Sequence, residues 1–369
     1  MLKSILGALV ASLLVFVNMG AAHEIRPAIA DLRLNDGQIR LEIRLNLEAI
    51  IAEIEPEITD TAESANAARY DALREMAPDA LLAAFDSSGF AARISASLDG
   101  APVALSVTET RPDPVGDIDL LRDTFVTLSA PLPADGSLTI GWDAAFGPLV
   151  LRLMDEGSDY STFLERGALS DPLPVRGTIS QSFGQVFLNY ITVGYTHIVP
   201  KGLDHILFVV GLFLLSASMR PLLWQISAFT VAHTITLALG LFDVVTVSPA
   251  IVEPLIALSI AYVAIENVFF AGLTRWRPVL IFGFGLLHGL GFASVLHEFG
   301  LTEGGEVAGL IGFNIGVELG QISVVLGCFL LVGFWFGRKP WYRAAITIPA
   351  SLAVAAVGMY WFVERAFLA

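Results

Sequence analysis

Histidine and acidic side chains recur in the second half of this sequence, among residues that are otherwise apolar. Imidazole nitrogens and carboxylate oxygens bind borderline divalent ions such as Ni2+, Co2+ and Zn2+. Ionisable groups are costly inside a membrane, so they usually mark a functional site there. These residue types therefore predict a metal site within an apolar part of the chain. The histidines concerned are His197, His205, His233, His288 and His297.

Three ligand-type side chains are expected at one depth of a bilayer. At about 1.5 Å per residue, His233 lies near the middle of a predicted second span, His288 near the middle of a fourth, and Glu318 about ten residues into a fifth. An unpaired carboxylate at that depth is costly, and matched depth is hard to obtain by accident. This favours a shared intramembrane site, although each histidine alone could instead bond to a neighbouring helix.

A second group of polar residues marks the outer ends of the predicted spans. His197, Asp204 and His205 surround the start of the first span, and His297 ends the fourth. These residues could form a vestibule above the midplane group. Residues at a helix end are cheaper to place because they reach water, and for His297 an interfacial role is the simpler interpretation.

Further polar residues lie on the predicted third and fifth spans. Asn314, Glu318 and Gln321 follow the i, i+4, i+7 spacing, which places them on one face of a helix. Asn314 and Gln321 could support the site or simply form hydrogen bonds between helices. Glu266 lies near the cytoplasmic end of the third span, where a relay role and a buried ion pair both remain open.

The composition predicts that the C-terminal half of the chain lies in a membrane. Hydrophobic residues make up 55% of the 369 residues and charged residues 15%, which is too apolar for an ordinary soluble protein. Apolar stretches near or above spanning length predict six helices. They cover residues 203–219, 222–242, 249–272, 278–298, 307–336 and 343–363.

Basic residues indicate how these helices are oriented. Lys and Arg fall in alternate connections, represented by Arg220, Arg275 and Arg338, and the opposite connections carry none. The positive-inside rule places the basic loops in the cytoplasm. The first span then runs inward, and residues 183–199 are expected to form an interfacial or re-entrant helix on the outer face.

The N-terminal half has the pattern of an exported, acidic domain. Residues 1–22 combine Lys3, an apolar core and small terminal residues, which predicts a signal peptide. The first 182 residues hold 27 acids and 13 bases, so most of the net charge of −15 lies here. That sign excludes nucleic acid as a partner. The single cysteine, Cys328, excludes an intramolecular disulfide framework.

Alternating polar and apolar residues predict strands in the segment 23–182. The clearest alternation is in residues 38–46, bounded by turn residues. We expect a small antiparallel β-sandwich with a helical insertion over residues 47–85. The other strand candidates lie near residues 26–34, 91–98, 102–109, 122–130 and 137–143.

Four polar segments resemble, in order along the chain, those of the HupE/UreJ family of hydrogenase and urease accessory membrane proteins. They are GYTHIVPKGLDHILFVVGLF (194–213), FTVAHTITL (229–237), LLHGLGFA (286–293) and FNIGVELGQ (313–321). The resemblance spans the membrane half, and the exported domain is similar to that of the longer branch of the family. It implies nickel uptake or delivery, with metal ligands at His197, Asp204, His205, His233, His288 and Glu318.

The predicted fold is an α-helical polytopic membrane bundle over residues 183–369, with a β-rich extracytoplasmic domain over residues 23–182. The bundle has about six spans and one outer interfacial or re-entrant helix. The favoured location is a bacterial-type inner membrane. The expected partners are membrane lipid, a divalent metal ion (Ni, Co or Zn) and an exported metalloenzyme.

A permease or metal-binding accessory protein is the favoured function, rather than an enzyme. An intramembrane zinc-dependent hydrolase is an alternative, with Glu318 or Asp204 as general base. No HExxH helix and no serine nucleophile motif supports it. A third alternative is an assembly factor whose acidic outer domain docks an exported metalloenzyme.

Overall fold

The computed structural model describes residues 27–367 and divides the chain at Ser182 and Phe183 into two compact units. The residues left out within that range are 57, 59–60, 62–63, 117–120, 159, 217 and 299–304, together with the side chains of 293–298. The expected signal peptide at residues 1–22 and the side chain of His297 therefore lie outside the described residues.

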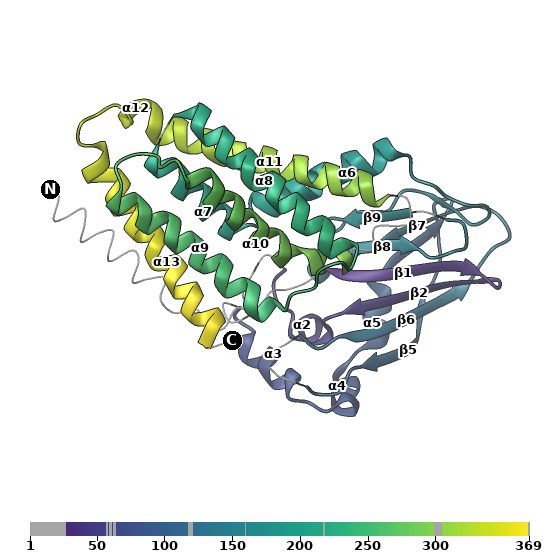
Figure 1. Ribbon diagram of the computed structural model, residues 1–369. Helices are drawn as coiled ribbons and strands as arrows, with labels where there is room; N and C mark the ends of the chain where they lie inside the picture. Colours follow the sequence, from purple (N-terminus) through teal and green to yellow (C-terminus); the bar gives the residue numbers. More distant parts are fainter. Residues whose placement is uncertain are drawn as a thin grey trace. The chain divides into compact units, whose positions relative to one another are not determined.

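The N-terminal unit is built on a six-stranded sheet in the order β5-β6-β2-β1-β8-β9 (Figure 1). A tight turn at Asp36 and Gly37, both with positive φ, joins β1 to β2, as a two-residue hairpin requires. The expected alternation is confirmed in β2, where Ile39, Leu41 and Ile43 are fully buried. The strands are β1 (Ala28–Asn35), β2 (Gln38–Leu45), β5 (Ser106–Pro112), β6 (Thr124–Pro131), β8 (Leu149–Leu153) and β9 (Tyr160–Leu164).

A smaller sheet has the order β10-β7-β3-β4. Its strands are β3 (Ser95–Leu98), β4 (Ala101–Pro102), β7 (Ser137–Gly141) and β10 (Leu173–Pro174). The expected purely antiparallel sandwich is corrected in one respect, because β1 and β8 of the larger sheet run parallel. Strands β8 and β9 were also not expected. Their pairing depends on contacts with β1, about 120 residues earlier, which a local alternation pattern does not report.

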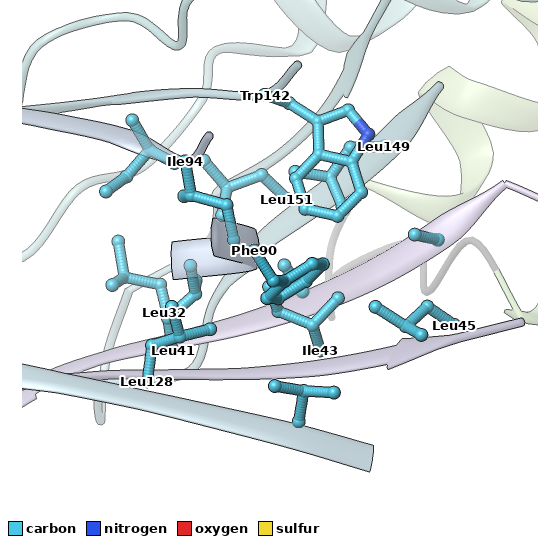
Figure 2. Packing of buried hydrophobic residues seen from close by; sticks show 14 of the residues in the cluster. Leu32, Leu41, Ile43, Leu45, Phe90, Ile94, Leu128, Trp142, Leu149 and Leu151 are labelled. Carbon is cyan, nitrogen blue, oxygen red and sulfur yellow. The ribbon is translucent and has the colours of Figure 1, made fainter. Parts of the chain in front are cut away.

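Both sheets and a group of short helices share one hydrophobic core (Figure 2). The helices lie within or near the expected insertion, and they are α2 (Leu47–Ala52), α3 (Ala67–Arg74), α4 (Pro78–Ala84) and α5 (Ser87–Ala92). Phe90 of α5 packs edge-on to Trp142, with ring centroids 6.3 Å apart. Glu48 of α2 pairs with Arg122, and both side chains are buried. The unit therefore has its own packed interior.

The C-terminal unit is helical, and four of its helices are long and apolar enough to cross a membrane. Two of them are α8 (Met219–Leu241) and α9 (Pro249–Phe269). The third, Glu306–Phe336, consists of α11 (Glu306–Cys328), η3 (Phe329–Gly333) and α12 (Phe334–Phe336), and the fourth, Arg343–Phe367, consists of η4 (Arg343–Thr347) and α13 (Ile348–Phe367). α10 (Arg277–Glu298) packs against α8 (Figure 1), and its described part is a shorter apolar helix. The protein is thus a membrane protein with four or five candidate spans among its described residues, where six were expected.

The fifth candidate span is a bent pair of helices. α6 (Phe183–Ile198) and α7 (Leu203–Leu215) are long and apolar enough to cross a membrane only as a pair, with an angle of 72° between them. The 13 residues of α7 reach about 20 Å at 1.5 Å per residue, which is less than the roughly 30 Å of a hydrocarbon core. The first predicted span, residues 203–219, is therefore too short to cross by itself.

α6, for which the sequence predicted an interfacial or re-entrant helix, packs along α11. Glycines of α11 allow this approach, because a Cβ atom at Gly312 would overlap the backbone of Phe187, and one at Gly316 the backbone of Ile191. Since both residue numbers rise together, the two helices run parallel. The contact is the close packing that small residues at four-residue spacing permit in membranes.

Connections that carry basic residues meet at one end of the helical unit. Arg277, at the start of α10, bonds to Glu266 of α9 and Gln225 of α8. Arg343, at the start of η4, bonds to the backbone carbonyls of Val268 and Phe270 at the end of α9. Exposed tryptophans lie in or beside the same connections, as expected at a membrane interface. They are Trp224, Trp276, Trp335 and Trp341.

Candidate metal centre

The site begins at the break between α6 and α7. His197 lies in the last turn of α6, and Asp204 and His205 lie in the first turn of α7. Pro200 has no N–H to continue a helix, and a Cβ atom at Gly202 would overlap the carbonyl of His197. The sequence between the two helices therefore breaks the span. A broken helix at membrane depth is tolerated where it is covered by protein.

Four histidines from four helices surround this break, and we call them the histidine cluster. His197 of α6, His205 of α7 and His233 of α8 each offer one ligand atom within 4.8 Å of the other two. His288 of α10 extends the group, because its ring centroid lies 4.9 Å from that of His205. His205 is central, since its ring also lies 4.9 Å from His197 and 5.9 Å from His233.

Each ring in the histidine cluster has one buried nitrogen with no hydrogen-bond partner among the described residues. These atoms are Nε2 of His197, His205 and His233, and Nδ1 of His288. Buried polar atoms in proteins are almost always bonded, so each exception requires an explanation. Four such nitrogens on adjacent rings have the chemistry of an imidazole ligand set for a divalent transition metal.

Aromatic side chains form much of the surroundings of the histidine cluster. Phe292 lies 4.1 Å from the ring of His197, centroid to centroid, and Phe313 lies 5.4 Å from it. Phe208 and Phe229 lie 5.2 Å and 5.0 Å from the ring of His288. These walls provide no hydrogen-bonding side chain of their own. Such apolar surroundings limit the access of water, so few water molecules compete with the imidazoles for a metal ion.

The two predicted carboxylate ligands have other partners and are not members of the group of ligand atoms found around His205. Asp204 accepts hydrogen bonds from Arg365 of α13, at 2.9 Å from Nη1 to Oδ2. Glu318 of α11 accepts a hydrogen bond of 2.7 Å from the hydroxyl of Ser227 on α8. The structure therefore brings the four histidines together, and it shows Glu318, which depth had grouped with His233 and His288, bonded to Ser227.

The predicted polar face of α11 points toward α8. The Oδ1 atom of Asn314 lies 3.1 Å from Nδ1 of His233, and Gln321 accepts a hydrogen bond of 3.1 Å from Thr230. Glu318 is the third member of this face through Ser227. Of the three, Asn314 is the one that directly contacts the histidine cluster.

Glu266 belongs to a separate polar network. Its carboxylate is 2.5 Å from Nη1 of Arg277, whose guanidinium is completely buried. Arg277 also donates to Gln225 at 2.9 Å. Of the two interpretations left open for Glu266, the structure shows the buried ion pair.

Sequence reasoning missed three features of this site. It did not interpret Pro200 and Gly202, although interruption of an apolar stretch by Pro and Gly can signal a broken span. It did not pair Arg365 with Asp204, because 161 positions separate them. It did not include Ser259 among the candidate site residues, although its hydroxyl lies 3.1 Å from Nε2 of His288. The contacts of Arg365 and Ser259 depend on how each helix is rotated about its own axis, which the sequence does not specify.

The candidate site lies in a part of the chain that matches the model of a known protein family. A family model described as HupE / UreJ protein matches residues 175–365, which include the whole histidine cluster. Searches of curated proteins and of solved structures returned no significant match.

Proposed function

The chain belongs to the HupE/UreJ family, a family of nickel and cobalt transport or accessory proteins, and on this basis we propose that it carries divalent transition-metal ions of the nickel and cobalt class across the membrane. The histidine cluster is the proposed binding site for the ion. In this proposal the metal is cargo rather than a permanent cofactor.

The unpartnered imidazole nitrogens are the observation that carries the proposal. A buried polar atom without a hydrogen-bond partner destabilises the folded state by about 1–3 kcal/mol. Four such atoms on adjacent rings therefore destabilise the fold considerably unless a ligand compensates. A metal ion compensates by accepting their lone pairs. Imidazole suits Ni2+, Co2+ and Zn2+, whereas Mg2+ and Ca2+ require oxygen ligands. The donor set therefore favours the former ions.

The broken span supplies the second argument. Discontinuous helices form ion sites in membrane transporters because their ends present unpaired backbone groups in the middle of the bilayer. Here His197 and His205 flank the break between α6 and α7. Both ligands are thus attached to the part of the span that has the least regular backbone.

The two carboxylates have transient roles in this proposal. Asp204 precedes His205 in the first turn of α7, and it receives the cation on the outer side before the histidine cluster does. Glu318 lies on the same face of α11 as Asn314, one turn further along the helix, and receives the cation on the inner side. Neither carboxylate is needed to hold the ion within the histidine cluster.

The N-terminal unit is placed outside the cytoplasmic membrane in this proposal. The basis is the predicted signal peptide, together with the positive-inside rule, which assigns the basic connections of the helical unit to the cytoplasm. The acidic charge of residues 23–182 would then attract cations to the membrane surface. An exported metalloenzyme is a further candidate partner for this unit.

Metal uptake and metal binding should both depend on the histidine cluster. We expect a His205→Ala/His233→Ala/His288→Ala variant, reconstituted in vesicles, to lose uptake of radioactive nickel and cobalt. Thr236→Val is the matched control, because among the described residues this α8 hydroxyl bonds to carbonyls of its own helix. Normal uptake by a correctly inserted triple variant would overturn the proposal. Metal binding without uptake in the wild-type protein would instead indicate a metal-binding accessory protein.

A further inference from the structure

We propose that Asn314 and Ser259 are positioning residues that fix the tautomers of His233 and His288, so that each ring presents a lone pair to the histidine cluster. This inference rests on the proposed function, because it concerns how the same metal site is prepared. Neither residue belongs to the proposed ligand set. Each bonds to the ring nitrogen that faces away from the unpartnered one.

The contacts of Asn314 determine which nitrogen of His233 carries the proton. The amide nitrogen of Asn314 donates to the carbonyl of Leu310 at 2.8 Å, so its Oδ1 is the atom that faces His233. Exchanging the amide oxygen and nitrogen would bring two acceptors together at Leu310, which the hydrogen-bond network disfavours. Oδ1 can only accept, and therefore Nδ1 of His233 donates to it across 3.1 Å. The lone pair of His233 is then on Nε2, its unpartnered nitrogen.

The contacts of Ser259 lead to the corresponding assignment for His288. A serine hydroxyl has a single hydrogen to donate, and that of Ser259 points to the carbonyl of Ile256 at 2.7 Å. The same oxygen must then accept from Nε2 of His288, 3.1 Å away. The lone pair of His288 is therefore on Nδ1, again the unpartnered nitrogen.

The two positioning residues come from helices that provide no ring to the histidine cluster. The rings belong to α6, α7, α8 and α10, whereas Ser259 is on α9 and Asn314 on α11. His233 and His288 both contact the central ring of His205. Outer partners that hold imidazole rings and set their tautomers commonly decide metal affinity. Here the outer partners are Ser259 of α9 and Asn314 of α11.

Both outer partners are uncharged, and this suits a site that must release its ion. A carboxylate partner would raise the basicity of the imidazole and strengthen its bond to the metal. An amide and a hydroxyl orient the ring without adding charge. Asn314→Asp should therefore tighten metal binding and slow transport, a combination that a purely structural residue would not produce.

Metal titrations of the purified full chain test the inference. Asn314→Leu and Ser259→Ala should each weaken binding of Co2+ by about 10- to 100-fold. Ser259→Thr keeps the hydroxyl and should restore binding close to that of the wild type. Thr236→Val, which removes a hydroxyl that bonds to backbone carbonyls of α8, should bind like the wild type.

The possible results separate this inference from the proposed function. If the wild-type chain binds no Co2+, the proposed function fails. If the wild type binds Co2+ and Asn314→Leu and Ser259→Ala bind it within twofold of the wild type, only the positioning role fails. Should either of those variants not insert, Asn314→Asp decides, because binding no tighter than that of the wild type contradicts the role of an oriented acceptor.

Discussion

Arg365 of α13 binds the carboxylate of Asp204 with both terminal nitrogens, at 2.9 Å from Nη1 to Oδ2 and 3.4 Å from Nη2 to Oδ1. Asp204 is the residue directly before His205, so this pair lies next to the histidine cluster. The guanidinium neutralises the carboxylate and places a fixed positive charge near the proposed cation site. An arriving metal ion must compete with that charge.

Removal of the Arg365 charge should therefore tighten metal binding. We expect Arg365→Gln to lower the dissociation constant for Co2+ by up to about tenfold, equivalent to about 1.4 kcal/mol, and to lose part of that gain at high salt. Calorimetric titration in detergent measures both effects. Arg338→Gln removes an exposed charge from the connection between α12 and η4, and it should have no effect. An Arg365→Gln variant with unchanged affinity would show that the pair is only structural.

The buried pair of Arg277 and Glu266 should be important for stability. Their side chains are 0% and 8% exposed, and loss of one partner from such a pair typically costs about 3–5 kcal/mol. Arg277→Met should therefore lower the thermal stability of the detergent-solubilised protein substantially. Arg275→Met is the matched control, because Arg275 is exposed and two residues away. Equal melting temperatures for the two variants would show that the ion pair does not stabilise the contact between α9 and α10.

Glycine at position 316 should be required for the contact between α6 and α11. Gly316→Val would force the backbone of α6 away, whereas a Cβ atom at Gly327 of the same helix meets nothing within 4 Å. We expect Gly316→Val to reduce both the yield of folded protein and metal binding. Gly327→Val should behave like the wild type. Cysteine crosslinking between α6 and α11 would report the separation directly, and intact crosslinking in Gly316→Val would contradict the prediction.

The N-terminal unit should lose local stability in acid through Asp143. A hydrogen bond from Arg93, 2.8 Å away, holds the pKa of Asp143 below its usual range. The stabilisation is present above the unfolded-state pKa, about 3.9, and is lost as the pH falls through the lower folded value. Because both side chains are partly exposed, the effect should be below about 1 kcal/mol.

Hydrogen exchange on the full-length protein can measure this local change. Peptides covering residues 137–147 should exchange faster as the pH falls from about 6 to 3, after correction for the intrinsic exchange rate. Asp143→Asn should exchange faster at neutral pH and show a flatter pH dependence, since no carboxylate remains to titrate. Identical pH dependence in both proteins would assign the acid sensitivity to another group.

Local patterns in the sequence predicted those parts of the fold that depend on local contacts. The alternation over Gln38–Leu45 and the turn at Asp36 and Gly37 determine a hairpin by themselves, and both are present. The family resemblance, which rested on four polar segments, is confirmed by the match over residues 175–365. Strand β8 was missed because its place beside β1 depends on distant residues.

The candidate site was only partly accessible from the sequence. Depth along a helix follows from residue number, and it correctly suggested that His233 and His288 lie close together, which the structure shows through their contacts with His205. Rotation about the helix axis does not follow from depth. The hydrogen bond from Ser227 to Glu318, whose depth is similar to that of these histidines, therefore could not be anticipated.

The packing of α6 against α11 has a consequence for biosynthesis. Among the described residues α6 is the first membrane helix to leave the ribosome, and the helix whose glycines accommodate it is made more than a hundred residues later. Until α11 is inserted, the interrupted backbone around Pro200 and the imidazoles beside it lack their protein cover. The nascent chain must therefore be sheltered by the insertion machinery until late in translation, and ribosome-bound intermediates that end before residue 306 should be preferred targets of membrane quality control.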